Sequence, residues 1–191
     1  MPLLSLMLSR PNSHRTLLRK LFIEDFPNLR TLSGHGIQTP VSLEDLSIKN
    51  CPNLEAVPTL GNLKSLRQLH IEKCGGLTSI PSGITSCTSL ATLSVIGCPN
   101  LISLADQVVS TLQSLRSLKL SDCGKLQYFP KGLQSLSRLG EMSIGAYWEE
   151  LVSIPDFQVP SQLERLELLG WPKLKSLPQQ IQDLASLPSK L

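Results

Sequence analysis

Four cysteines are the residues of this sequence whose type and spacing could do chemistry. Cys51, Cys74, Cys98 and Cys123 follow one another at intervals of 23 to 25 residues, and Cys87 lies outside this spacing. A cysteine thiolate can act as a nucleophile or bind zinc, and two thiols can form a disulfide. Which of these applies depends on the elements that position the four side chains.

The regular interval belongs to a repeat of the whole chain. The stretch LEDLSIKNCPNLEAVP, which contains Cys51, recurs with the pattern L-x-x-L-x-[LIV]-x-x-C-x-x-L-x-x-[LIV]-P. The units begin at Leu18, Leu43, Leu66, Leu90, Leu115, Leu139 and Leu163. Such a period indicates an array of stacked structural units.

Each unit predicts one short strand. In the second unit, Leu46 and Ile48 fall on one face and Ser47 on the other, because side chains alternate across a strand. The proline that ends most units stops extended pairing, and apolar residues at three-residue spacing then predict a short 3₁₀ turn. Stacking makes the strands parallel, so we expect a curved solenoid with a parallel sheet on its concave face and turns on its convex face.

The position of the four cysteines favours packing over chemistry. Other units fill the same position with Phe26, Tyr147 and Trp171, and free cysteine behaves as a small hydrophobe. Stacked units also place the thiols along a line, which does not suit a tetrahedral zinc site. A reducing compartment disfavours disulfides. Cys87 is predicted in a turn with no evident partner.

Other chemistry-bearing residues do not form a recognisable motif. His14, His35 and His70 fall at unrelated places, and only His70 lies on an expected strand, so we predict neither an enzyme nor a metal site. The net charge of +3 and 4% aromatic content disfavour nucleic acid as a partner. No segment is predicted to be a signal peptide or a membrane span. We therefore expect a cytoplasmic or nuclear protein with neither membrane nor small-molecule substrate as its partner.

These units resemble leucine-rich repeat proteins, and within them the irregular repeats of plant intracellular nucleotide-binding leucine-rich repeat (NB-LRR) disease resistance proteins. The narrower resemblance rests on the phrase Cys-Pro-Asn-Leu at Cys51 and Cys98 and on the L-x-x-[LIV]-P ending. It implies a defence role, in which the repeats recognise a pathogen effector or a guarded host protein. It also implies that they hold the receptor's own nucleotide-binding domain inactive.

The nucleotide-binding domain of that family is not expected in this sequence. A P-loop needs G-x-x-x-x-G-K-[ST], whereas Gly124-Lys125 is followed by Leu126 and lacks the earlier glycine. We therefore predict no cofactor for this chain, since ADP or ATP would belong to the missing domain. The predicted organisation is an irregular segment or degenerate repeat over 1–17, seven repeats over 18–178 and the start of a truncated eighth repeat over 179–191.

The outward-facing positions of the strands are the candidate partner-binding site, because the repeat pattern leaves them free to vary. Glu24, Lys49 and Glu72 alternate in charge and are expected to neutralise one another across strands. Trp148 lies where the sixth unit carries an extra residue, and either binds a partner or packs over the neighbouring turn. The predicted site residues are Asp45, Lys49, His70, Glu72, Ile96, Lys119, Asp122, Glu141, Trp148, Arg165, Glu167 and Leu169.

Two alternatives remain open from the sequence. The substrate adaptors of F-box-type ubiquitin ligases also use leucine-rich repeats, but they need a helical docking segment that residues 1–17 are too short to hold. The other alternative is a truncated, non-signalling receptor fragment. The segment upstream of Met1 in the genome would separate these possibilities.

Overall fold

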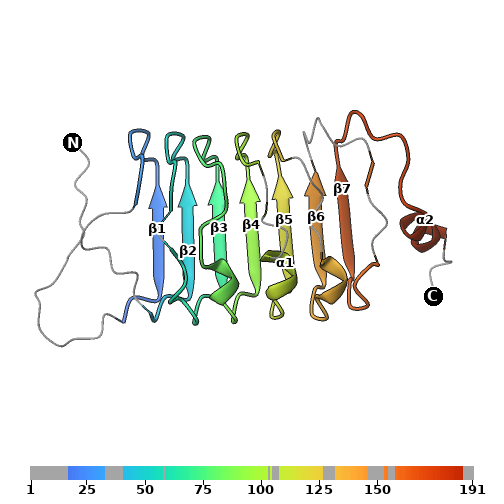
Figure 1. The fold of residues 1–191 in the computed structure, drawn as a ribbon, viewed down its shortest axis with the longest axis horizontal. Coiled ribbons are helices and arrows are strands. Elements are labelled where there is room, and N and C mark those ends of the chain that lie inside the picture. The colour runs from blue at the N-terminus through green and yellow to red at the C-terminus, as the bar shows by residue number, and fades with distance from the viewer. Residues whose placement is uncertain are drawn as a thin grey trace, which may run out of the picture.

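The structure is a computed structural model that describes residues 17–32, 41–57, 59–102, 104, 108–126, 132–145, 153–154 and 158–186. Seven strands form one parallel sheet in chain order (Figure 1). They are β1 (Lys20–Glu24), β2 (Asp45–Lys49), β3 (Gln68–Glu72), β4 (Thr92–Ile96), β5 (Ser117–Ser121), β6 (Glu141–Gly145) and β7 (Arg165–Leu169). The prediction of one strand per unit is confirmed.

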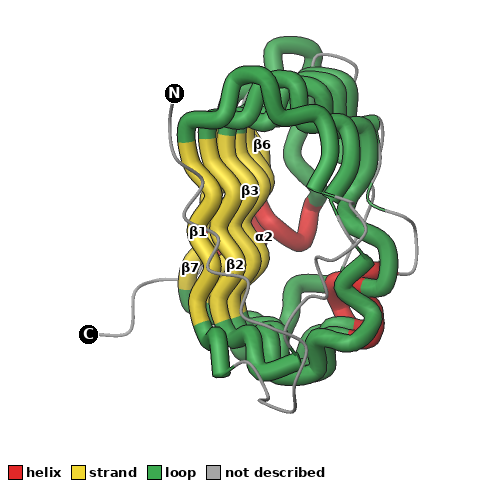
Figure 2. Tube along the Cα trace, turned by 90° about the vertical axis from the view of Figure 1, so that its left-hand side faces the viewer, coloured by secondary structure: helices red, strands yellow, loops and turns green. Residues whose placement is uncertain are grey.

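Short helical segments lie on the side of the coil opposite the sheet, whereas the helix labelled α2 in Figure 2 lies in that view between this side and the strands. Two are 3₁₀ turns, η1 (Ile84–Ser86) and η2 (Leu133–Ser135), as the spacing predicts. Two are α-helical: α1 (Val108–Thr111) and α2 (Gln179–Ser186). α2 follows Pro178, and the amide of Ile181 donates to the Pro178 carbonyl at 3.0 Å. None of the described helices is long and apolar enough to cross a membrane.

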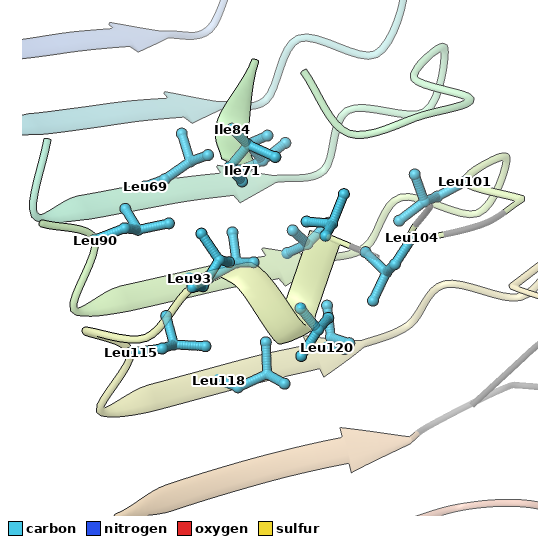
Figure 3. Close-up of a cluster of buried hydrophobic side chains, with 14 of the residues drawn as sticks. Leu69, Ile71, Ile84, Leu90, Leu93, Leu101, Leu104, Leu115, Leu118 and Leu120 are labelled. Atoms are coloured by element: carbon cyan, nitrogen blue, oxygen red, sulfur yellow. The ribbon is translucent and has the colours of Figure 1, made fainter. Parts of the chain in front are cut away.

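The core is a stack of aliphatic side chains between the sheet and the turns. Leu69, Leu93 and Leu118 are register partners on β3, β4 and β5, and they lie one above another in Figure 3. Each is at most 1% exposed. Burying one such side chain contributes about 1.5–3 kcal/mol, so the fold rests on the repetition of these contacts.

A left-handed turn ends most strands and carries the ladder of hydrogen bonds one residue further. Asp25, Asn50, Lys73, Gly97 and Asp122 follow their strands with φ between 50° and 66°. The amide of each donates to a strand-end carbonyl of the next unit, at 2.8 to 3.2 Å. Asn, Asp and Gly tolerate this conformation best, so Lys73 is the residue with the greatest strain.

Candidate interaction face

The strands present every second residue away from the core, and we call these positions the outer sheet face. The first column, in strand order, is Lys20, Asp45, Gln68, Thr92, Ser117, Glu141 and Arg165. The middle column is Phe22, Ser47, His70, Ser94, Lys119, Ser143 and Glu167. The third column is Glu24, Lys49, Glu72, Ile96, Ser121, Gly145 and Leu169. Ten of the twelve predicted site residues therefore share this face.

Large and small side chains alternate along the middle column, which the sequence analysis missed. Ser47, Ser94 and Ser143 are 4%, 9% and 8% exposed, although they point away from the core. Each lies between two larger residues of neighbouring strands, whereas Phe22 at the edge is 63% exposed. Ser47 holds one of the outward-facing strand positions that the sequence assigns to the candidate site, but its burial makes it unavailable to a partner. The alternation is readable in the sequence only once the register of all seven units is written out.

The charges of the third column are partly neutralised within the sheet. Lys49 Nζ lies 3.4 Å from Glu72 Oε2 on the adjacent strand, which confirms the expected cross-strand pair. In the first column, Asp45 Oδ1 is buried and has no hydrogen-bond partner. His70 is half-buried, and its Nε2 lies 3.4 Å from Gln68 Oε1. These residues give the β2–β3 region a mixed, mostly engaged set of polar groups.

The predicted place of Asp122 on this face needs correction. The register pairs Ser121 with Ile96, so Ser121 holds the position in the third column. Asp122 follows the strand in the left-handed turn, with φ of 55°. Sequence spacing alone did not separate the last strand residue from the first turn residue.

The apolar candidates differ in how much surface they offer. Leu169 is 42% exposed at the end of β7, whereas Ile96 is half-buried between Glu72 and Ser121. Phe22 on β1 is more exposed than either and is the apolar residue that the site prediction omitted. Trp148 lies outside the described residues.

A hollow of about 180 Å³ lies on the outer sheet face over β5, β6 and β7. Its polar lining residues are Ser117, Lys119, Glu141, Ser143, Arg165 and Glu167. Four of these were predicted as site residues from scattered repeats, and the register brings them together. Sequence reasoning gave no reason to prefer this end of the sheet.

An ion pair orders one side of the hollow. Arg165 Nη2 and Nε donate to Glu167 Oε1 at 2.5 and 3.1 Å. The Arg165 hydrogen bond holds the pKa of Glu167 below its ordinary value, and the same contact raises the pKa of Arg165. The nearby Ser143 hydroxyl dipole also lowers the pKa of Glu167, but its buried Oγ does not reach hydrogen-bond geometry with the carboxylate or with any other described protein atom. Both charges therefore persist across the physiological pH range.

The cysteines are buried parts of the core. All five described cysteines are 0% exposed, and none forms a disulfide. Burial raises the pKa of the Cys74 and Cys98 thiols to about 12 and that of the Cys87 and Cys123 thiols to about 11. The neutral thiols act as hydrogen-bond donors. Cys51 Sγ donates to the Lys49 carbonyl at 3.3 Å, and Cys87 Sγ, which lies in a turn, donates to the Leu60 carbonyl at 3.6 Å. A neutral, buried thiol suits neither nucleophilic attack nor metal binding.

Within the described part of the chain, no group of three or more His, Cys, Asp or Glu side chains is placed to hold a metal ion. The arrangement that the described residues do offer is a rigid sheet with a row of varied side chains. Its chemistry is that of contact with another surface through ion pairs, hydrogen bonds and isolated apolar side chains.

Seven parallel strands, one for each leucine-rich unit, define this chain as a leucine-rich repeat solenoid. No family model matches the sequence. Over 60 residues, which are 31% of this chain, it is 40% identical to the disease resistance protein RPP5 of Arabidopsis thaliana. That match spans 4% of the length of RPP5. A leucine-rich repeat protein of Leptospira interrogans superposes on 87% of this chain and 58% of its own, with 17% identity and a TM-score of 0.36.

Proposed function

We propose that this chain is a protein-binding module, the recognition arm of a plant intracellular immune receptor. The observation that carries the proposal is the outer sheet face. The strand residues that point into the core are uniformly apolar, whereas the three columns of the outer sheet face carry acidic, basic, hydroxyl and apolar residues on a fixed spacing. A rigid surface of this kind can recognise another protein without reorganising its backbone. The local similarity to RPP5 supports the defence role.

In this role the chain would bind a pathogen effector or a guarded host protein. It would also contact the receptor's own nucleotide-binding domain and hold that domain inactive. ADP or ATP would bind to that domain, so the solenoid itself needs no cofactor and performs no reaction. The role places the chain in the cytoplasm.

Differential proximity labelling tests the proposal. The chain is fused to a promiscuous biotin ligase and expressed in leaf cells with and without pathogen infection. The face variant Ile96→Asp/Leu169→Asp is compared with a control, Thr85→Asp/Gln134→Asp, which adds the same charges on exposed residues of η1 and η2. We expect effector or immune-receptor proteins to be labelled by the original chain and the control and lost in the face variant.

Equal labelling by all three proteins would contradict the placement of the site on the outer sheet face. Labelling restricted to the core subunits of a ubiquitin ligase and their substrates would instead support the adaptor function.

A further inference from the structure

The hollow over β5–β7 has the dimensions of a site for side chains. Pockets for small organic ligands typically enclose about 300–1,000 Å³. At about 180 Å³, this hollow holds one or two side chains of a partner protein. Glu141 and Glu167 would also repel a phosphate backbone, so the lining disfavours nucleic acid.

Two of the four charges in the hollow are already paired, and two are not. Arg165 and Glu167 engage each other at 2.5 Å. Lys119 is exposed and takes part in none of the ion pairs found among the described residues. In the described part of the chain, Glu141 accepts a single long hydrogen bond, 3.4 Å, from Ser117 Oγ. The hollow therefore has one cation and one anion that remain available to a partner.

A buried hydroxyl lies beside the available cation. Ser143 is the register partner of Lys119 on one side and of Glu167 on the other. It is 8% exposed, lines the hollow, and its Oγ has no hydrogen-bond partner. A buried hydroxyl without a hydrogen bond is unfavourable, so an acceptor that enters the hollow and reaches Ser143 Oγ would satisfy it.

The spacing of the two available charges suits a partner segment in the extended conformation. Lys119 is in the middle column and Glu141 in the first, two positions apart along the strand direction. Because the two residues also lie on adjacent strands, about 4.8 Å apart, their Cα atoms are separated by about 8 Å. Residues two apart on one strand are separated by about 6.6–6.8 Å, and the flexible Lys and Glu side chains span the difference. An acidic and a basic residue separated by one position would therefore reach both at once.

We propose that this hollow binds an extended protein segment that presents an acidic and a basic side chain two residues apart. The carboxylate accepts from Lys119 Nζ and Ser143 Oγ, and the basic side chain donates to Glu141. This inference rests on the proposed function, because it specifies the chemistry of the partner on the outer sheet face.

Titration of the isotope-labelled chain with three synthetic peptides, followed by the NMR shifts of its backbone amides, tests the proposal. The mixed peptide is acetyl-TETKT-amide, and the others are all-acidic acetyl-TETET-amide and all-basic acetyl-TKTKT-amide. We expect the mixed peptide to bind about tenfold more tightly than the other two and to shift amides of β5–β7.

Charge reversal at either residue should switch the preference. Lys119→Glu should favour the all-basic peptide and Glu141→Lys the all-acidic peptide. Ser143→Ala removes a hydroxyl that has no hydrogen-bond partner in the free chain. It should lower the affinity for the mixed peptide several-fold and should have little effect on the stability of the fold. Arg30→Glu, which alters net charge as Lys119→Glu does but lies before β2, should leave the order of affinities unchanged.

The inference is overturned if no peptide shifts the amides of β5–β7 at concentrations up to about 10 mM. It is also overturned if the mixed peptide binds no better than the others, or if Arg30→Glu produces the same switch as Lys119→Glu. These results would leave the broader proposal standing, because proximity labelling tests the outer sheet face as a whole.

Discussion

Asn100 Nδ2 donates a hydrogen bond to the carbonyl of Gly75, at 2.7 Å, and so joins one repeat to the previous one. Asn53 does the same one unit earlier, with the carbonyl of Pro27, at 2.7 Å. These contacts give the phrase Cys-Pro-Asn-Leu a physical role. The cysteine fills the core, and the asparagine satisfies a carbonyl that the turn leaves without a backbone donor.

Removing this asparagine should destabilise the array. We expect Asn100→Ala to lower the free energy of unfolding by about 1–2 kcal/mol, because it leaves the half-buried Gly75 carbonyl unpaired. Urea unfolding followed by circular dichroism measures the change. The exposed Asn62 has no hydrogen-bond partner among the residues that the structure describes, so Asn62→Ala should stay within about 0.5 kcal/mol of the original chain. Equal losses in the two variants would contradict the role assigned to Asn100.

The strained turn after β3 should be improved by glycine. Lys73 has φ of 54°, a conformation that costs a residue with a side chain about 1–2 kcal/mol. Glycine relieves this cost but loses more conformational entropy on folding than lysine does. The net effect that we expect is that Lys73→Gly stabilises the chain by about 0.5–1 kcal/mol. Lys64, which lies outside the positive-φ residues, is the control, and Lys64→Gly should be neutral or destabilising. The midpoints of thermal unfolding of the two variants measure this difference. A loss of stability in Lys73→Gly would contradict the claim that Lys73 is strained.

Gly145 allows β7 to approach β6. A Cβ atom at this position would collide with the Leu169 carbonyl oxygen, and φ is 130°. We expect Gly145→Ala to cost at least about 2 kcal/mol in chemical unfolding. The nearest atom to a Cβ at Gly140 is 3.8 Å away, so Gly140→Ala in the same unit should be tolerated. Comparable losses in the two variants would show that close approach is not the cause.

The repeat pattern specified the strands, their parallel order and the packed cysteines, because each depends on residue types at fixed intervals. The burial of Ser47 could not be read in this way, since it depends on the larger neighbours that adjacent strands bring beside it. Asp122 was misplaced because strand ends and left-handed turns both use polar residues. The hollow depends on Lys119, Ser143 and Glu167 meeting in register, although they are more than 20 residues apart in the chain.

The buried thiols should make the chain sensitive to alkaline pH. Cys98 has a pKa of about 12 in the folded chain, against about 9 when unfolded. Between these two pKa values the unfolded state binds fewer protons than the folded state. The contribution of the Cys98 thiol to the free energy of unfolding is therefore fully present below pH 9 and decreases as the pH rises above 9. By pH 10.5, each such thiol should lower the free energy of unfolding by up to about 2 kcal/mol relative to its value below pH 9.

Chemical unfolding at pH 8 and pH 10.5 measures this dependence. Cys98→Ala should be less stable at pH 8 but should lose less stability between the two values than the original chain. Parallel losses in the two proteins would mean that the Cys98 thiol does not contribute to the pH dependence.

The outer sheet face as the binding surface is the central claim, and hydroxyl-radical footprinting of the chain bound to its captured partner tests it most directly. Phe22, His70 and Leu169 report on this face, whereas Ile102 and Leu177 are exposed at 44% and 38% outside the sheet. We predict that the partner lowers oxidation of at least one of the first three side chains and leaves Ile102 and Leu177 unchanged. Protection of Ile102 or Leu177 with no change at Phe22, His70 and Leu169 would contradict the claim.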